Sequence, residues 1–289
     1  MTNAPDLRRK VCLVTGATSG VGLATARALA GMGATTLLVA RDAGRGERTR
    51  REIAAATGSQ DVDVMLADLS SRAQVHRLAE QVHDRTDRLH VLVNNAGLTM
   101  RRRRVTEDGL EWVLAVNHLA PFLLTNLLLD LLRAGAPSRV VTVTSSAQSV
   151  GRIDFDDLQG ERRYRGQRAY NQSKLANVMF TYELARRLEG TGVTATCVHP
   201  GVVRTNFGVD GPLPVRLLIP LGRRFMRSPE QGADTVVWLA SSPDVEGVSG
   251  RYFTRRRAIA SSRRSYDQDG ARRLWEISRR LTGLVETGP

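Results

Sequence analysis

Short apolar runs alternate with longer stretches of helical spacing along most of the chain. Each run is rich in β-branched residues and continuously apolar, as expected of a strand that is covered on both faces of a parallel sheet. Between the runs, apolar residues recur at the three-to-four-residue spacing of helices. This alternation predicts an α/β fold with a doubly wound parallel sheet and helices on both faces. The runs are VCLVTG (11–16), TTLLVA (35–40), VDVMLAD (62–68), LHVLVNN (89–95), SRVVTVTSS (138–146) and GVTATCVHPG (192–201).

The last third of the chain departs from this rhythm before returning to it. Residues 206–228, which contain a Gly-Pro-Leu-Pro sequence, are predicted to form an irregular lobe over the substrate. SGRYF (249–253) is typical of a seventh strand, and the amphipathic ARRLWEISRRL (271–281) predicts a C-terminal helix within 262–284. No linker, repeat or low-complexity tract divides the first 200 residues. Residues 1–289 are therefore expected to form one domain, with the cofactor-binding and catalytic core at about 8–205.

One segment, residues 113–132, is apolar enough to raise the possibility of a membrane span. It contains side chains that are costly in lipid, so a long, mostly buried helix is the better interpretation. The chain opens with the polar and basic MTNAPDLRRK, which has no secretory signal. We therefore expect no membrane anchor and a cytoplasmic location. The polar interruptions of the segment are Asn117, His118, Pro121, Asn126 and Asp130.

The composition adds a strong positive charge to this picture. The chain of 289 residues is 42% hydrophobic and 25% charged, with a formal net charge of +13. Such a balance invites a nucleic-acid reading, but nearly all basic residues are arginines scattered over the predicted helices. Only Lys10 and Lys174 are lysines. We expect no nucleic-acid partner, and we interpret Arg101–Arg104 and Arg255–Arg257 as surface loops, with an anionic substrate or partner as the alternative.

Cysteine and histidine usage changes the picture little. Cys12 and Cys197 each lie in an apolar run, which indicates buried free thiols rather than a disulfide framework. His76 and His83 are seven residues apart on a predicted helix, and no cysteine joins them at the close spacing of a zinc site. No metal site is predicted. A hydrolase of the G-x-S-x-G type is excluded because that motif does not occur.

The first strand leads into a glycine-rich turn. Gly16, Gly20 and Gly22 form the pattern G-x-x-x-G-x-G between this strand and a helix. A side chain at these positions would keep a pyrophosphate away from the backbone amides and from the helix N-terminus, which favours anions. A tight turn without a ligand is the alternative, but the position after the first strand favours a dinucleotide site. The candidate phosphate-binding residues are Gly16, Thr18, Ser19, Gly20, Val21 and Gly22.

The end of the second strand bears on the choice of cofactor. A fold that selects NAD usually places a carboxylate here, to accept hydrogen bonds from the ribose hydroxyls. This chain has Arg41, with Asp42 one residue later. A guanidinium can pair with a 2′-phosphate, so NADP(H) is favoured over NAD(H). After the third strand, Asp68 and Leu69 are candidates for the adenine edge, although Asp68 is also suited to capping the following helix.

The remaining motifs complete a family pattern. NNAG (94–97), the serine pair 145–146, YNQSK (170–174) and HPG (199–201) follow the glycine-rich turn in order. With these motifs the chain resembles the short-chain dehydrogenase/reductase family, from Val11 to about Leu284. Within it, VNHLAPFLL, FDDLQ and SKLANVMFTYELARRL resemble the retinol dehydrogenase-like branch, which includes the WW-domain oxidoreductases. The resemblance implies a single Rossmann-type sheet of about seven strands.

The resemblance also assigns catalytic roles. It implies Tyr170 as the general acid/base and Lys174, one helical turn later, as the ammonium that favours its phenolate. An isolated tyrosine titrates near ~10, which is why such help is needed. Ser146 would hold the substrate oxygen, with Ser145 as the alternative if the register is off by one. Asn117 would complete a proton relay to solvent, and it is equally suited to satisfying backbone groups at a helix bend.

Further cofactor contacts follow from the same resemblance. The resemblance implies a nicotinamide cofactor, NADP(H) or NAD(H), and a small-molecule carbonyl or alcohol as substrate. We expect the substrate to be apolar because the covering lobe is rich in Leu, Ile, Phe and Met. A homodimer or homotetramer is expected through the long helices that include residues 105–133 and 170–189. The additional cofactor-binding candidates are Asn95, Ala96, Gly97, Tyr170, Lys174, Pro200, Gly201, Val203 and Thr205.

Other functions remain as alternatives at this point. The main one is a catalytically silent NADP-binding sensor or scaffold of the same fold, which would tolerate loss of the tyrosine, lysine or serine. An enzymatic neighbour is the light-dependent reductase branch, which shares these motifs but reduces a ring double bond. Because all three catalytic residue types are present, an oxidoreductase is favoured.

Overall fold

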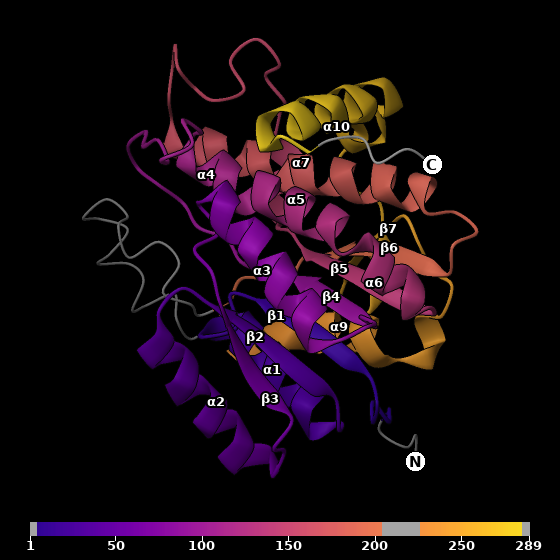
Figure 1. Ribbon diagram of the computed structural model, residues 1–289. Coiled ribbons are helices and arrows are strands. Elements are labelled where there is room, and N and C mark those ends of the chain that lie inside the picture. The colour runs from indigo at the N-terminus through magenta and orange to yellow at the C-terminus, as the bar shows by residue number, and fades with distance from the viewer. Residues whose placement is uncertain (1–4, 204–225, 285–289) are drawn as a thin grey trace.

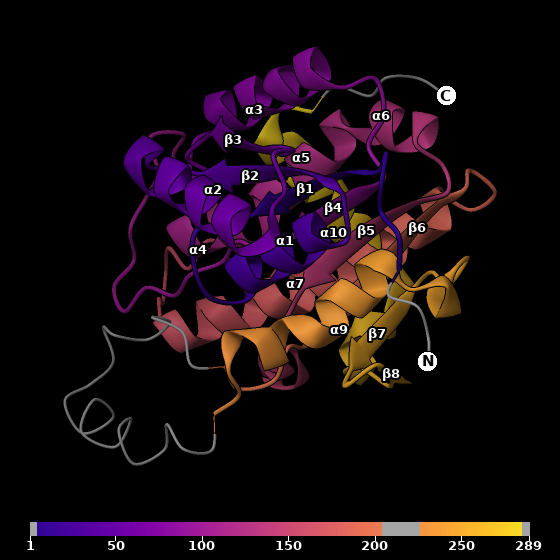
Figure 2. The same ribbon diagram turned by 90° about the horizontal axis from the view of Figure 1, so that it is seen from below.

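The computed structural model describes residues 5–203 and 226–284, and these form one sheet flanked by helices. The strands lie in the order β3-β2-β1-β4-β5-β6-β7-β8, and Figure 2 shows them following one another from β3 at one edge to β8 at the other. All neighbouring pairs are parallel except β7 and β8. The strands are β1 Val11–Thr15, β2 Thr35–Ala40, β3 Val62–Leu66, β4 Val91–Asn94, β5 Ser138–Val143, β6 Val193–Val198, β7 Arg251–Thr254 and β8 Arg257–Ile259.

Helices cover both faces of this sheet. One face carries α1, α2 and α9, and α1 packs along α9 (Figure 2). The other carries α3, α5 and α7, and α10 lies outside α7 as an additional layer (Figure 1). The helices are α1 Gly20–Gly31, α2 Ala43–Thr57, α3 Arg72–Arg85, α4 Trp112–Leu114, α5 Ala120–Leu127, α6 Leu129–Ala134, α7 Gly166–Arg187, α9 Pro229–Ser241 and α10 Gln268–Thr282, joined by shorter helical turns at η1 Ala115–Leu119, η2 Ser146–Val150, η4 Pro243–Val245 and η5 Arg263–Tyr266.

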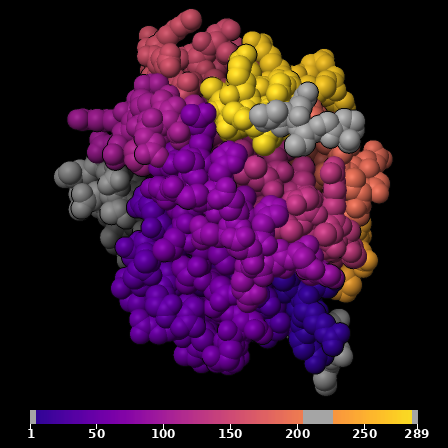
Figure 3. Space-filling model, in the orientation of Figure 1, coloured from indigo at the N-terminus to yellow at the C-terminus, as the bar shows by residue number. Residues whose placement is uncertain are grey.

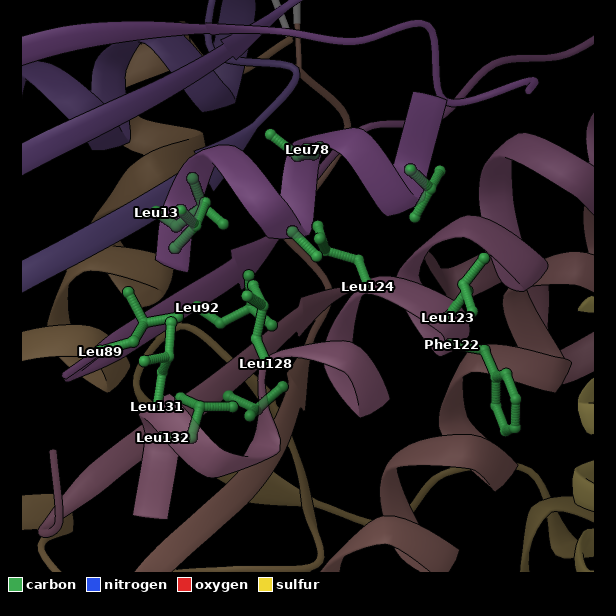
Figure 4. Packing of buried hydrophobic residues seen from close by; sticks show 14 of the residues in the cluster. Leu13, Leu78, Leu89, Leu92, Phe122, Leu123, Leu124, Leu128, Leu131 and Leu132 are labelled. Atoms are coloured by element: carbon green, nitrogen blue, oxygen red, sulfur yellow. The ribbon is translucent and has the colours of Figure 1, made fainter. Parts of the chain in front are cut away.

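The buried side chains explain why the strand sequences are continuously apolar. Leu13 of β1 and Leu92 of β4 point into the cluster under α3 and α5, where Figure 4 shows them near Leu78 and Leu124. Their neighbours on the same strands, Cys12 among them, point into the cluster under α1 and α9. Since successive strand residues face opposite sides, both sides of each strand need apolar residues. The prediction of free, buried cysteines is confirmed for Cys12 and Cys197.

The strand order positions the site. β1 lies between β2 and β4, and the chain leaves it toward β3 on one side and toward β5 on the other. In doubly wound sheets neighbouring helices diverge at such a point, and ligands bind in the crevice outside the carboxyl ends of the strands. We therefore expect the ligand-binding crevice at the carboxyl ends of β1 and β4. The glycine-rich turn, the NNAG segment, the serine pair and the HPG segment all follow strands at this edge.

The prediction of seven strands holds for β1 to β7, with the last at Arg251–Thr254 as expected. β8 is an additional antiparallel edge strand, too short at Arg257–Ile259 to be recognised from sequence. The C-terminal helix is confirmed as α10, preceded by the turn η5. Most of the predicted substrate-covering lobe, residues 206–225, lies outside the described residues.

The prediction of a long, mostly buried helix over residues 113–132 is confirmed for its burial, but the segment is not one regular helix. The segment consists of α4, the π-helical turn η1, then α5 and α6, with a break at Leu128. Pro121 has no N–H to donate to the carbonyl of Asn117, four residues earlier, and this disfavours a regular α-helix through the segment. Across the described ranges 5–203 and 226–284, no helix combines the length and apolarity that a bilayer crossing requires.

The turn between β7 and β8 is a site for a gain in stability. It has two residues, Arg255 and Arg256, with φ angles of 49° and 57°. Both lie in the left-handed region, where Asn and Gly are preferred in such hairpins. We expect Arg255→Asn to raise the free energy of unfolding by about 1 kcal/mol and the melting temperature by about 2 °C. Thermal and urea denaturation measure this, and Arg257→Asn, in β8, should show no gain. Equal stability of the Arg255 variant and the parent would show that the left-handed conformation of Arg255 is not strained.

Candidate active site

The glycine-rich turn has the backbone geometry that its sequence predicts. Gly16 and Gly20 have φ angles of 65° and 55°, in the left-handed region that favours glycine. A Cβ atom at Gly22 would lie 2.3 Å from the carbonyl oxygen of Gly16, so only glycine fits. Helix α1 begins at Gly20, and Ser19 at its N-cap makes no side-chain capping bond. The turn therefore brings a helix N-terminus and open backbone amides to the crevice, a cradle suited to a pyrophosphate.

The NNAG segment is fastened to this turn. The hydroxyl of Thr15, at the end of β1, accepts hydrogen bonds from the backbone N–H groups of Asn95 (2.9 Å) and Ala96 (3.0 Å). The Asn95 side chain donates to the carbonyl of Thr15 at 2.8 Å. The carboxyl ends of β1 and β4 are thus held together, and both predicted cofactor segments line the same crevice.

The residues after β2 and β3 include candidates for cofactor binding, and several of them also stabilise the fold. Arg41 is exposed, and its guanidinium Nη1 lies 4.0 Å from Asp68 Oδ2. The Asp42 carboxylate caps α2 by accepting from the backbone N–H of Arg45 at 2.7 Å. Asp68 accepts from the backbone and hydroxyl of Ser70, so it also stabilises its own turn. Leu69 packs against the core cluster under α3. Arg41 is therefore the charged side chain that β2 presents at the crevice.

Tyr170 lies in the first turns of α7 and contacts the side chain of Ser145. Burial raises the pKa of the Tyr170 phenol, and a hydrogen bond with the Ser145 side chain opposes that rise in part. Ser146 is exposed. Ser145 is extended and N-caps the 3₁₀ turn η2, where its side chain accepts from the backbone N–H of Ala147 at 3.2 Å, and Ser146 is the first residue of that turn. The sequence preferred Ser146 and left Ser145 as the alternative; the contact with Tyr170 favours Ser145, and the role of either serine stays a prediction.

Lys174 lies one helical turn after Tyr170 and is buried. Its Nζ donates to the carbonyl of Val143 at 3.1 Å and lies 5.7 Å from the centroid of the Tyr170 ring. Burial lowers the pKa of Lys174 to about 8. A Cβ atom on Gly97 would lie 3.3 Å from this Nζ, so the ammonium also borders the NNAG segment. Lys174 therefore stands between the tyrosine and the segment predicted to contact the cofactor.

Asn117 occupies the π-helical turn η1 and is completely buried. Its side-chain oxygen accepts from the backbone N–H of Leu98 at 2.8 Å, and its amide donates to the Leu98 carbonyl (2.9 Å) and to Ser173 Oγ (3.0 Å). Asn117 thus satisfies buried backbone groups, as one of its two sequence interpretations expects, but these belong to Leu98 in the loop after β4 and not to the helix itself. Its side-chain oxygen and Lys174 Nζ both lie close to Gly97, and the relay role stays a prediction.

The HPG segment follows β6 and is braced by a residue that the sequence did not single out. Gly201 has a φ angle of 91°. The Arg227 guanidinium donates to the carbonyl of Pro200 at 3.2 Å, and Val203 forms a parallel bridge with Arg227. Arg227 lies at the end of the lobe, far along the chain, so no local pattern could have identified it. Thr205 lies outside the described residues.

His83 and two residues of the arginine run make contacts within the protein. Within residues 5–203 and 226–284, no group of three His, Cys, Asp or Glu side chains could hold a metal ion. His83 instead pairs with Asp130 at 2.9 Å. The arginine run after β4 lies at the surface as predicted, where Arg103 donates to the Gln159 carbonyl and Arg104 stacks over Trp112.

Comparison with known proteins identifies the same family that the motifs at this site resemble. The family model of the short chain dehydrogenases matches residues 10–210. Human retinol dehydrogenase 14 is 44% identical, over 96% of this chain and 87% of that protein. An uncharacterised Mycobacterium paratuberculosis protein of known structure is 35% identical, with a TM-score of 0.80 over 97% of this chain and 96% of its own. The Pseudomonas aeruginosa RhlG/NADP complex is 28% identical, with a TM-score of 0.70 over 88% and 97%.

Proposed function

The chain belongs to the short chain dehydrogenase family, and we propose that it interconverts a carbonyl and an alcohol on an apolar substrate with NADP(H). It is an oxidoreductase acting on CH–OH donors, similar to the retinol dehydrogenases. The observation that carries the proposal is the cluster of Ser145, Tyr170 and Lys174 beside the NNAG segment, which is itself fastened to the glycine-rich turn. It joins a proton-transfer group to a dinucleotide cradle in one crevice.

In this proposal the protein handles the proton and the orientation of the substrate. The nicotinamide, when bound, supplies or accepts the hydride. Ser145 and Tyr170 hold the substrate oxygen between them, and the Tyr170 hydroxyl gives its proton to that oxygen in reduction and removes it in oxidation. The Lys174 ammonium, one turn along α7, favours the phenolate over the neutral phenol. Asn117 keeps the segment around Leu98 in place next to Lys174.

The preference for NADP(H) rests on the end of β2. Arg41 is exposed there, and its nearest carboxylate is at the 4.0 Å limit of an ion pair. Asp42, the only carboxylate adjacent to it in sequence, is engaged as the cap of α2. A guanidinium can bind a 2′-phosphate through two parallel hydrogen bonds. Complexes of NADP with related structures support the same choice.

Steady-state kinetics with NADPH and NADH, on a panel of aldehydes, ketones and retinoids, test this function. We expect turnover with NADPH and a KM for NADPH that rises about 10- to 100-fold in Arg41→Ser, because a charge-assisted pair contributes ~1.5–3 kcal/mol. The KM for NADH should change little. Arg45→Ser, on the first turn of α2, is the matched control. Absence of product with either cofactor across the panel would remove the enzyme proposal, and equal effects on both cofactors would remove the role of Arg41.

The remaining predictions from sequence keep their status. The silent sensor or scaffold has no observation in its favour, because the serine, tyrosine and lysine that it could lose are all present and adjacent. A homodimer or homotetramer and a cytoplasmic location stay predictions. For the oligomer, α10 packs along α7 and covers part of the surface that pairing through that helix would use (Figure 1).

A further inference from the structure

His118 connects the C-terminal helix to the catalytic region through its two ring nitrogens. It follows Asn117 in the π-helical turn and is 1% exposed. Nδ1 lies 3.1 Å from Asn177 Oδ1, on α7, and Nε2 lies 2.9 Å from Ser278 Oγ, on α10. The Asn177 amide then donates to the backbone carbonyl of Asn117 at 2.7 Å. Four polar groups from three elements thus form one chain of hydrogen bonds.

The direction of each bond follows from the one group that can only accept. Because the Asn117 carbonyl is an acceptor, Asn177 must turn its NH₂ toward it and its oxygen toward His118. His118 Nδ1 must therefore carry a hydrogen. The ring is neutral, since burial lowers the pKa of His118 to about 4, so Nε2 has a lone pair. The Ser278 hydroxyl has one hydrogen and two acceptors within reach, Nε2 of His118 at 2.9 Å and the backbone carbonyl of Leu274, one turn earlier on α10, at 2.8 Å. Only donation to Nε2 gives this buried lone pair a partner, so the hydrogen is assigned to Nε2. The chain runs from Ser278 through His118 and Asn177 to the Asn117 carbonyl.

The carbonyl at the end of this chain needs an external donor. In an α-helix it would accept from the N–H of residue 121, and residue 121 is proline. The Asn177 amide takes that place, at 2.7 Å. The Asn117 side chain, on the same residue, makes the bonds to Leu98 and Ser173 described above. Fixing the carbonyl of Asn117 therefore also fixes the orientation of its side chain.

The surroundings of His118 are apolar. Its ring lies 6.4 Å from Phe122 and 6.3 Å from Phe180, between centroids. Trp275 of α10 covers both, at 4.9 Å from Phe122 and 5.7 Å from Phe180. Figures 1 and 3 show α10 as the outer layer over this region. In such a site a broken hydrogen bond is poorly replaced, so each member of the chain depends on the next.

We propose that Ser278 and His118 are positioning residues for the dehydrogenase reaction, which hold Asn117 in its catalytic orientation from the C-terminal helix. The inference rests on the proposed function for its kinetic consequence, whereas the direction of the hydrogen bonds stands without it. It gives α10 a role in turnover, although none of the site residues named above lies on this helix.

The kinetic test compares two hydroxyl deletions on α10. Ser278→Ala removes the first donor of the hydrogen-bond chain. We expect kcat to fall about 5-fold, because the Asn117 side chain is held less firmly in its orientation. The KM for NADPH should be unchanged within about 2-fold, because the glycine-rich turn is intact. Thr282→Val is the matched control: this buried hydroxyl donates to the Ser278 carbonyl at 2.8 Å and does not contact His118. It should lower the melting temperature similarly and leave kcat unchanged. An equal loss of kcat in both variants would reduce Ser278 to a structural role and overturn the proposal.

A second pair of variants tests the link through His118. In His118→Asn the introduced side-chain amide can donate to Asn177 from about the position of Nδ1, so kcat should stay within about 3-fold of the parent. His118→Leu retains bulk but no donor, and kcat should fall by about 10-fold or more. Equal kcat in these two variants would contradict a hydrogen-bond chain that passes through His118. Should the leucine variant fail to fold, the comparison of Ser278→Ala with Thr282→Val decides.

The tautomer of His118 can be measured without any substrate. Two-bond ¹H–¹⁵N spectra of histidine-labelled protein should show a neutral ring with the hydrogen on Nδ1, and Ser278→Ala should shift the Nε2 resonance. A hydrogen on Nε2 would overturn the direction of the chain. This measurement also separates the two proposals. If no substrate is turned over, the function fails while the tautomer still tests the chain; turnover that is insensitive to Ser278→Ala overturns the positioning role alone.

Discussion

Tyr170→Phe should reduce kcat by about 10³-fold in both directions, because it removes the only hydroxyl proposed to exchange a proton with the substrate oxygen. Binding of NADPH should change little, since the phenol does not belong to the glycine-rich turn. Stopped-flow or steady-state absorbance of NADPH measures the rate, and fluorescence titration measures cofactor affinity. The two readouts separate a catalytic loss from a loss of binding.

Tyr182→Phe provides the control on the same helix. Its hydroxyl is hydrogen-bonded to Ser261 Oγ at 2.7 Å, and the residue is buried. This variant loses the same atom from the same residue type further along α7, so it should keep kcat and lose some stability. Undiminished turnover in Tyr170→Phe would place the proton transfer on another group. The proposed mechanism would then be wrong, although the cofactor cradle would stand.

Ser145→Ala should lower kcat/KM for alcohol oxidation by about 10²-fold and move its pH profile upward. The sign follows from the hydrogen bond, which lowers the pKa of Tyr170 against the rise caused by burial. The phenolate is the base in oxidation, so the rate rises with pH through that pKa. Without Ser145 the ionised phenol loses a donor, its pKa rises further, and a higher pH is needed to reach the same fraction of base.

Ser146→Ala is the matched variant one residue away. Ser146 is exposed, so its removal should leave both the rate and the profile near those of the parent. Rates of alcohol oxidation between about pH 6 and 11, a range that brackets the free tyrosine value of ~10, measure both effects. The reverse result, with Ser146→Ala impaired and Ser145→Ala normal, would restore the sequence preference for Ser146.

The local sequence pattern was sufficient to predict the elements whose conformation is determined by residues close together in sequence. The strands were predicted because both of their faces are buried, and the turn at Gly16–Gly22 because its backbone excludes side chains. The choice between Ser145 and Ser146 was not decided by pattern. It depends on where β5 gives way to η2 and on how α7 packs, and both are tertiary properties.

Longer-range features could not have been predicted. The π-helical turn at Ala115–Leu119 was read as ordinary helix, because its compensating donor, Asn177, comes from another element. Ser278 is 160 residues from His118 in sequence, and no pattern connects two such positions. Arg227 illustrates the same limit at the HPG segment. In each case a backbone group is satisfied by a side chain that only the assembled fold brings near.

The burial of Lys174 has a practical consequence for handling this protein. Lys10 is the only other lysine of the chain, and it lies immediately before β1, at the amino-terminal edge of the sheet. Reagents that attach to ε-amines, such as dyes or activated surfaces, therefore have one accessible lysine to modify. Lys10 lies at the opposite edge of the sheet from the crevice, so a protein attached to a surface through Lys10 keeps the crevice open to solution.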